Sequence, residues 1–132
     1  MTIATALSDK LKKADLAEPR AYIAGEWRDK VTSGKTFDVV NPATGDVIAT
    51  LPDCGKEEVE EAVAAAYEAQ KAWAKKTGKE RAQILRKLYD LMVENADDLA
   101  VILTAEMGKP LAEARGEVLY GAAYIEWFGE EA

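Results

Sequence analysis

Few side chains in this sequence could do chemistry, and a lone cysteine is the first of them. Cys54 is the only thiol in 132 residues, and the chain has no histidine, which excludes a histidine-based triad and an HExxH zinc site. Cys54 lies between Asp53 and Glu57, whose charges disfavour a thiolate, although the start of a helix nearby favours one. We interpret Cys54 as an inert, partly buried thiol and predict no catalytic residue in this chain.

Three aromatic side chains near the end of the sequence form a second group. Tyr120, Tyr124 and Trp127 follow one another at spacings of four and three, so they share one face of a helix. Such residues usually pack in a core. A partly apolar wall beside a ligand is the alternative, and the spacing alone does not decide between the two.

Groups that could hold a cofactor or a metal are sparse. The nine glycines contain no GxG pair, and no GxxxxGK[ST] motif is present, so we predict no cofactor-binding residue here. Glu106, close to Gly108, is either a solvated or a structural carboxylate. A single carboxylate makes only part of a site for a hard cation.

Composition narrows the possible partners. The 24 acidic and 17 basic residues give a net charge of −7, and the cations are scattered, which argues against binding to nucleic acid. The apolar runs fall far short of the roughly 20 residues that span a bilayer. The start of the chain lacks the features of a secretory signal. These features predict a cytoplasmic protein with no membrane partner.

The elements that must position these side chains change character at Gly55. Residues 20–54 predict two short β-hairpins, the first turning at Gly25 and the second at the Asn-Pro-Ala-Thr-Gly segment, residues 41–45. Residues 1–19 are predicted to be an N-terminal extension with a short helix over 8–16. The length allows one domain.

From residue 55 onward, apolar residues recur at helical spacing and predict about four helices. Thr77 and Glu80 have the spacing of a capping box at the start of the second. The third ends at Gly108, and Pro110 suits the first turn of the fourth. The fourth has an apolar stripe and an aromatic stripe, so it needs two packing partners.

Five motifs recur in one order in a known enzyme family. They are Tyr22–Trp27, the Asn41-Pro42 turn, Lys79-Glu80-Arg81, Glu106–Pro110 and Glu126-Trp127-Phe128. In this order they resemble the opening of the aldehyde dehydrogenases, from about Ala21 to Ala132. Leu111–Val118 and Tyr124–Phe128 are most similar to the succinate-semialdehyde dehydrogenase branch.

This resemblance implies an α/β enzyme, of which residues 20–132 form a truncated N-terminal part of the cofactor-binding domain, itself α+β. The complete enzyme would oxidise an aldehyde, in this branch succinate semialdehyde, to a carboxylate through a cysteine thiolate, with NAD or NADP accepting the hydride. It would be a homo-oligomer. The truncated chain would bind no cofactor, would be inactive and would self-associate.

The resemblance also assigns roles to individual residues. In the complete enzyme Tyr120, Tyr124 and Trp127 would border the tunnel for the aldehyde. Glu106 and the main-chain carbonyl of Val40 would help to hold a monovalent cation. The alternative for the whole chain is a non-catalytic helical module that binds another protein through its acidic surface and its last helix.

Overall fold

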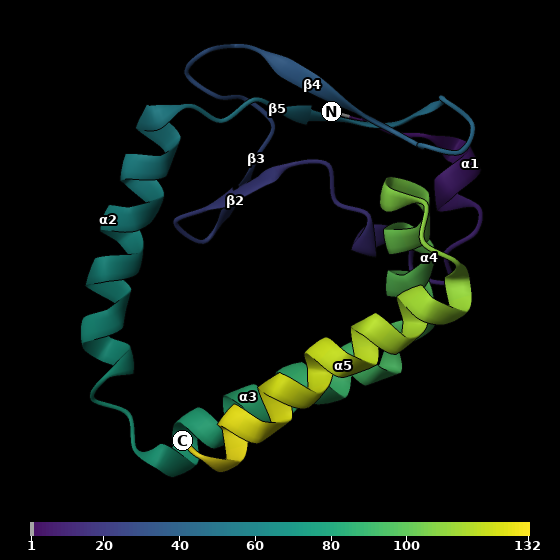
Figure 1. The fold of residues 1–132 in the computed structure, drawn as a ribbon. Coiled ribbons are helices and arrows are strands. Elements are labelled where there is room, and N and C mark those ends of the chain that lie inside the picture. Colours follow the sequence, from purple (N-terminus) through teal and green to yellow (C-terminus); the bar gives the residue numbers. More distant parts are fainter. Residues whose placement is uncertain (1) are drawn as a thin grey trace.

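The computed structural model describes residues 2–132, which form two small sheets followed by a series of helices (Figure 1). The elements, in chain order, are β1 (Thr2–Ile3), α1 (Thr5–Ser8), the 3-10 turn η1 (Ala14–Leu16), β2 (Ala21–Ile23), β3 (Glu26–Arg28), β4 (Thr36–Val40), β5 (Val47–Pro52), α2 (Lys56–Trp73), α3 (Gly78–Glu94), α4 (Ala96–Met107) and α5 (Leu111–Glu130). The predicted combination of two hairpins and four later helices is confirmed.

Both hairpins have turns that their sequences favour. In the first, β2 and β3 are antiparallel and joined through Ala24 and Gly25, which both have positive φ. In the second, β4 and β5 are joined by a turn in which the Asn41 side chain accepts a hydrogen bond from the N–H of Ala43, 2.9 Å away. Gly45 closes this turn with a φ of +80°. The predicted hairpins did not include β1, which pairs with the other edge of β5 and completes a sheet of order β1-β5-β4.

The N-terminal segment differs from its prediction. The short helix lies at Thr5–Ser8, and residues 8–16 do not form one helix. The reason lies in α4, where the buried carboxylate of Asp98 accepts hydrogen bonds from the backbone N–H groups of Lys12 (3.1 Å) and Lys13 (2.8 Å). A helix over 8–16 would use these groups internally. The side chain of Leu7 is also buried.

Helices α3, α4 and α5 pack together, and we call them the helical unit. In Figure 1, α5 lies along α3 over most of its length. Small residues make this close approach possible, and four of them are almost fully buried: Ala96, Ala100, Ala114 and Ala122. Near the end of α5, a Cβ on Gly129 would lie 3.4 Å from the Cβ of Leu85 on α3. The contact between these helices is therefore close but contains little large apolar surface.

The ends of the helical unit follow the sequence signals. The predicted capping box is confirmed, because the Thr77 hydroxyl accepts from the N–H of Glu80 while the Glu80 carboxylate accepts from the N–H of Thr77 (2.8 Å). Helix α4 ends at Gly108, which has a φ of +78°. Pro110 lies just before the first residue of α5.

Helix α2 has different surroundings. It contacts chiefly β2, and Figure 1 shows it standing apart from α4 and α5. Its one buried residue is Glu58, whose carboxylate accepts from the N–H groups of Gly55 (2.8 Å) and Thr32 (2.6 Å). These hydrogen bonds lower the pKa of Glu58 to about 2, with the contribution of Thr32 the largest. Glu58 thus fixes the start of α2, while the apolar side chains of the helix contribute no buried core.

No helix within residues 2–132 combines the length and the apolar composition that crossing a bilayer requires.

Candidate functional site

The predicted aromatic residues of α5 are brought together on its outer side. Tyr120, Tyr124, Trp127 and the neighbouring Phe128 are all at least half exposed, and we call these four residues the aromatic face. The rings of Tyr120 and Tyr124 meet edge to face with centroids 5.1 Å apart. Their hydroxyl oxygens are 2.6 Å apart, and this hydrogen bond raises the pKa of Tyr124. In the described chain these residues therefore form a surface and not a core.

The aromatic face contains an open hollow of about 350 Å³, lined by Ala123, Tyr124, Trp127 and Phe128. Its wall is mostly apolar, and its lining includes no carboxylate, amine or thiol. Phe128 was not among the predicted tunnel residues. The signal for it was present, because Phe128 follows Tyr124 by four positions and so falls on the same side of the helix.

The opposite side of α5 holds the aromatic face in place. Ala122 and Gly129 pack toward α3, and an ion pair of 3.0 Å joins Arg86 of α3 to Glu126 of α5. Near the start of α5, Arg115 pairs with Asp97 of α4 at 2.9 Å. Arg115 is therefore engaged in an ion pair within the helical unit.

The predicted cation ligands lie on two segments that meet. Val40 is the last residue of β4, and Glu106 lies in the last turn of α4. Contact between the segments is close, since a Cβ on Gly108 would lie 3.0 Å from Cγ of Pro42. Within residues 2–132 the Glu106 carboxylate has no hydrogen bond or ion pair. Nor does this range contain a group of three or more acidic, cysteine or histidine side chains that could hold a metal. One carboxylate and one carbonyl are thus only a partial set of ligands.

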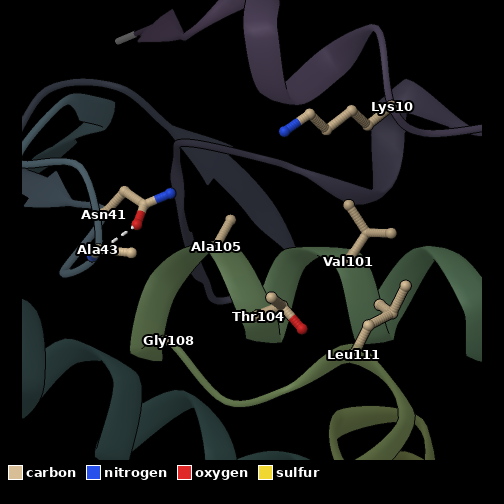
Figure 2. Close-up of a pocket in the computed structure, with 8 residues that line it drawn as sticks. All are labelled: Lys10, Asn41, Ala43, Val101, Thr104, Ala105, Gly108 and Leu111. Atoms are coloured by element: carbon tan, nitrogen blue, oxygen red, sulfur yellow. Dashed lines mark hydrogen bonds between the residues drawn. The ribbon is translucent and has the colours of Figure 1, made fainter.

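A cavity of about 270 Å³ adjoins this junction (Figure 2). The ammonium of Lys10 and the amide nitrogen of Asn41 point into the same space, while the Thr104 hydroxyl turns away toward Leu111. The Thr104 oxygen is buried and has no hydrogen-bond partner in the described range. Without a nucleophile beside an acid or a base, this cavity offers no catalytic arrangement.

The prediction for Cys54 is partly wrong. Its side chain is exposed and not partly buried, because it lies in the short loop between β5 and α2, where the chain turns away from the sheet. Across residues 2–132 its sulfur has no hydrogen-bonding partner that could activate it. The absence of a catalytic residue in the chain stays a prediction.

Comparison with solved protein structures shows to which class of protein this fold belongs. The solved succinate-semialdehyde dehydrogenase of Burkholderia pseudomallei superposes with a TM-score of 0.88 and 51% identity, over 92% of this chain and 25% of that one. The fold is therefore that of the N-terminal quarter of an aldehyde dehydrogenase.

Comparison of the amino-acid sequence identifies the same family of enzymes. The chain matches the profile of the aldehyde dehydrogenase family over residues 27–132. It is 53% identical to the glutarate-semialdehyde dehydrogenase of Pseudomonas putida, over 93% of the chain and 25% of that protein. It is 49% identical to the NADP(+) succinate-semialdehyde dehydrogenase of Escherichia coli, over 92% of the chain and 25% of that protein. The chain belongs to the aldehyde dehydrogenase family, and it spans about a quarter of the length of these relatives.

Proposed function

We propose that this chain serves as the N-terminal part of a cytoplasmic NAD- or NADP-dependent semialdehyde dehydrogenase, with succinate semialdehyde as the substrate. The identity of about half of all residues to two semialdehyde dehydrogenases, over more than nine-tenths of the chain, carries the proposal. Succinate and glutarate semialdehydes both have an aldehyde at one end, a carboxylate at the other and a short methylene chain between them. Glutarate semialdehyde is the alternative substrate.

The aromatic face is the part of this chain that would meet the substrate. Its apolar hollow suits the methylene chain of a semialdehyde. Tyr120, Tyr124 and Trp127 would border the path of the aldehyde, and the Arg86–Glu126 ion pair would hold the helix that carries them. None of the residues that line this hollow is an arginine for the carboxylate end, and Arg86, which reaches α5 from α3, is paired with Glu126 in the described structure. That contact would come from other parts of a complete enzyme.

Cofactor chemistry would also depend on other parts. NAD or NADP accepts a hydride from the substrate when bound. This chain has no glycine-rich phosphate cradle, and its only thiol is exposed and unactivated among the described residues. We therefore expect the 132-residue chain to show no binding of NAD or NADP in calorimetric titration and no turnover. Cofactor binding at micromolar concentration would contradict this expectation.

The Val40 and Glu106 pair would supply two oxygen ligands to a monovalent cation in a complete enzyme. Support comes from the contact between the two segments at Pro42 and Gly108, and from the unpaired carboxylate of Glu106 within the described range. The remaining ligands would be water or groups from other segments.

A chimaera tests the proposed function. This chain would replace the first quarter of the P. putida glutarate-semialdehyde dehydrogenase, and reduction of NAD and NADP would be followed with succinate semialdehyde, glutarate semialdehyde and uncharged butanal. We expect turnover, with kcat/KM highest for succinate semialdehyde. A folded chimaera that oxidises none of these aldehydes would contradict the proposal and favour the alternative of a non-catalytic protein-interaction module.

Three variants of the chimaera refine this test. Trp127→Ala should lower kcat/KM for the semialdehydes about tenfold, which corresponds to about 1.4 kcal/mol. Trp27→Ala is the control, because this tryptophan is also exposed (50%, against 64% for Trp127) but packs on Tyr22 in the first hairpin, and it should have little effect. Cys54→Ser should leave turnover within a few-fold of the parent. Equal losses for the two tryptophan variants would contradict a role of the aromatic face in the substrate path.

A further inference from the structure

The cavity between the N-terminal segment, the second hairpin and α4 has a distinctive lining (Figure 2). Its volume is about 270 Å³, and the ammonium of Lys10 and the side-chain amide nitrogen of Asn41 both point into it. The lining contains no carboxylate, and four of its residues form apolar walls: Ala43, Val101, Ala105 and Leu111. The cavity therefore offers hydrogen-bond donors and one positive charge next to apolar surface.

The orientation of the Asn41 amide is fixed by the turn in which it lies. Its oxygen accepts the hydrogen bond of 2.9 Å from the N–H of Ala43, so its nitrogen faces the other way, into the cavity. Within residues 2–132 this nitrogen donates to no other group. The turn itself lies close against the end of α4, because a Cβ on Gly108 would be only 3.0 Å from Cγ of Pro42. The amide donor is thus held in place and is available to a ligand.

Lys10 lies in a turn that is anchored on both sides. The N–H of Lys10 donates to the carbonyl of Leu7 (3.0 Å), and the side chain of Leu7 is buried. Two residues later, the N–H of Lys12 donates to the buried carboxylate of Asp98 (3.1 Å). Lys12 and Lys13 pair with acidic side chains of α4 and α3, whereas Lys10 forms no ion pair in the described part of the chain. Its ammonium can therefore bind an anion that enters the cavity.

We propose that this cavity binds the carboxylate of a short aliphatic acid, at a site separate from the aromatic face. One carboxylate oxygen accepts from the Lys10 ammonium and the other from the Asn41 amide, while the alkyl chain lies on the apolar walls. A carboxylate matches the two donor groups and the single positive charge. A phosphate group is a poorer occupant, because it carries about 1.5–2 negative charges at pH 7 and more acceptor oxygens than these two groups can satisfy.

The site and the aromatic face lie at opposite ends of α5. Leu111 in the cavity wall is the first residue of the helix, whereas the hollow of the aromatic face is lined by residues of its last turns. The proposal goes beyond the proposed function and does not depend on it, because it concerns binding by this chain alone.

Saturation-transfer NMR tests the proposal on the full 132-residue chain, with butyrate as the probe and the ionic strength held constant. The method observes the signals of the small ligand, so self-association of the chain does not hide binding. We expect saturation of the butyrate protons, with a dissociation constant in the millimolar range, and at least fivefold weaker transfer to butanamide, which has a similar size but no charge. Equal transfer to the two compounds would contradict the proposal. Displacement of butyrate by an equal or lower concentration of inorganic phosphate would also contradict it.

Two variants locate the site. Asn41→Asp keeps an oxygen that accepts from the N–H of Ala43, and so keeps the turn, but it replaces the donor in the cavity with a charged oxygen. Lys10→Met removes the positive charge from an exposed side chain and should leave the fold intact, as circular dichroism can verify. Each variant should weaken butyrate binding at least fivefold.

Lys30→Met is the matched control for the loss of charge. Lys30 is also an exposed lysine outside the helices and strands, but it does not line this cavity, so its variant should bind butyrate as the parent does. Equal losses in Lys30→Met and Lys10→Met would show that butyrate responds only to the total charge of the chain, and the proposed site would be wrong. Unchanged binding in Lys10→Met would have the same meaning.

Discussion

Helices α2 and α5 are similar in length and both have apolar faces, yet their surroundings differ. Helix α5 buries Ala114, Ala122 and Gly129 against its neighbours in the helical unit. Helix α2 buries only the charged residue Glu58. The comparison shows that an apolar period predicts a helix and the side that needs a partner, but it does not predict whether that partner lies within the same 132 residues.

The difference between α2 and α5 also indicates which side chains contribute to the stability of the fold and which are free to contact a partner. Close contacts between small residues hold α3, α4 and α5 together, and the aromatic face is left over on their outer side. Helix α2 has almost no such contacts, so its apolar side chains are available for a partner. We therefore expect substitutions in the helical unit to change the free energy of unfolding, and substitutions of Val59, Val63 or Tyr67 on the exposed side of α2 to change it little.

The largest effect on stability is expected at Asp98. Asp98→Asn removes the charge and one acceptor from a buried group that holds the N–H groups of Lys12 and Lys13, so we expect a loss of about 1.5–3 kcal/mol. Urea unfolding measures the loss, and hydrogen exchange should become faster in residues 2–16. The neighbouring Asp97→Asn is the control, because Asp97 is exposed and its ion pairs contribute little. Equal effects of the two variants would show that the N-terminal segment is not held by Asp98.

The next effect is expected where the helical unit meets the second hairpin. Gly108→Ala places a Cβ at a φ of +78° and 3.0 Å from Cγ of Pro42. The left-handed conformation alone costs about 1–2 kcal/mol for a residue with a Cβ. Thermal unfolding should show this loss. Gly116→Ala is a suitable control, since Gly116 lies in α5 with open space around its Cβ position, and there alanine should be neutral or stabilising.

A smaller, pH-dependent effect is expected at the start of α2. The pKa of Glu58 is about 2 in the folded chain and 4.5 ordinarily, so its carboxylate favours the folded state. Because the folded value is the lower one, this contribution is complete above about pH 4.5 and is lost as the pH falls toward 2. Glu58→Gln should therefore lower stability at pH 7 and flatten the loss between these values. A parallel pH profile for parent and variant would contradict the role of Glu58.

Much of the fold could be predicted because its signals are local. The Asn41 turn, the Thr77 and Glu80 capping box and the end of α4 at Gly108 each depend on residues a few positions apart. The N-terminal segment could not be predicted in this way. Its conformation depends on Asp98, 85 or more positions away, and β1 depends on the far edge of β5.

The candidate site shows the same limit. Spacing alone brought Tyr120, Tyr124 and Trp127 to one side of a helix, but it did not show whether that side is buried. The exposure of Cys54 was missed for a related reason, since burial depends on which elements pack over a loop. Local patterns predict directions of side chains, and only the packing of distant segments decides their surroundings.

The smallest effect on stability is expected at the exposed apolar residues of α2, and it tests the contrast between α2 and α5 most directly. Val63→Ala removes two methyl groups from a side chain that is 63% exposed, while alanine has the higher helix propensity. The two contributions oppose each other, so the free energy of unfolding of the chain should change by no more than about 0.5 kcal/mol. A large loss of stability in the chain alone would mean that α2 already packs in solution, and the contrast between α2 and the helical unit would then be wrong.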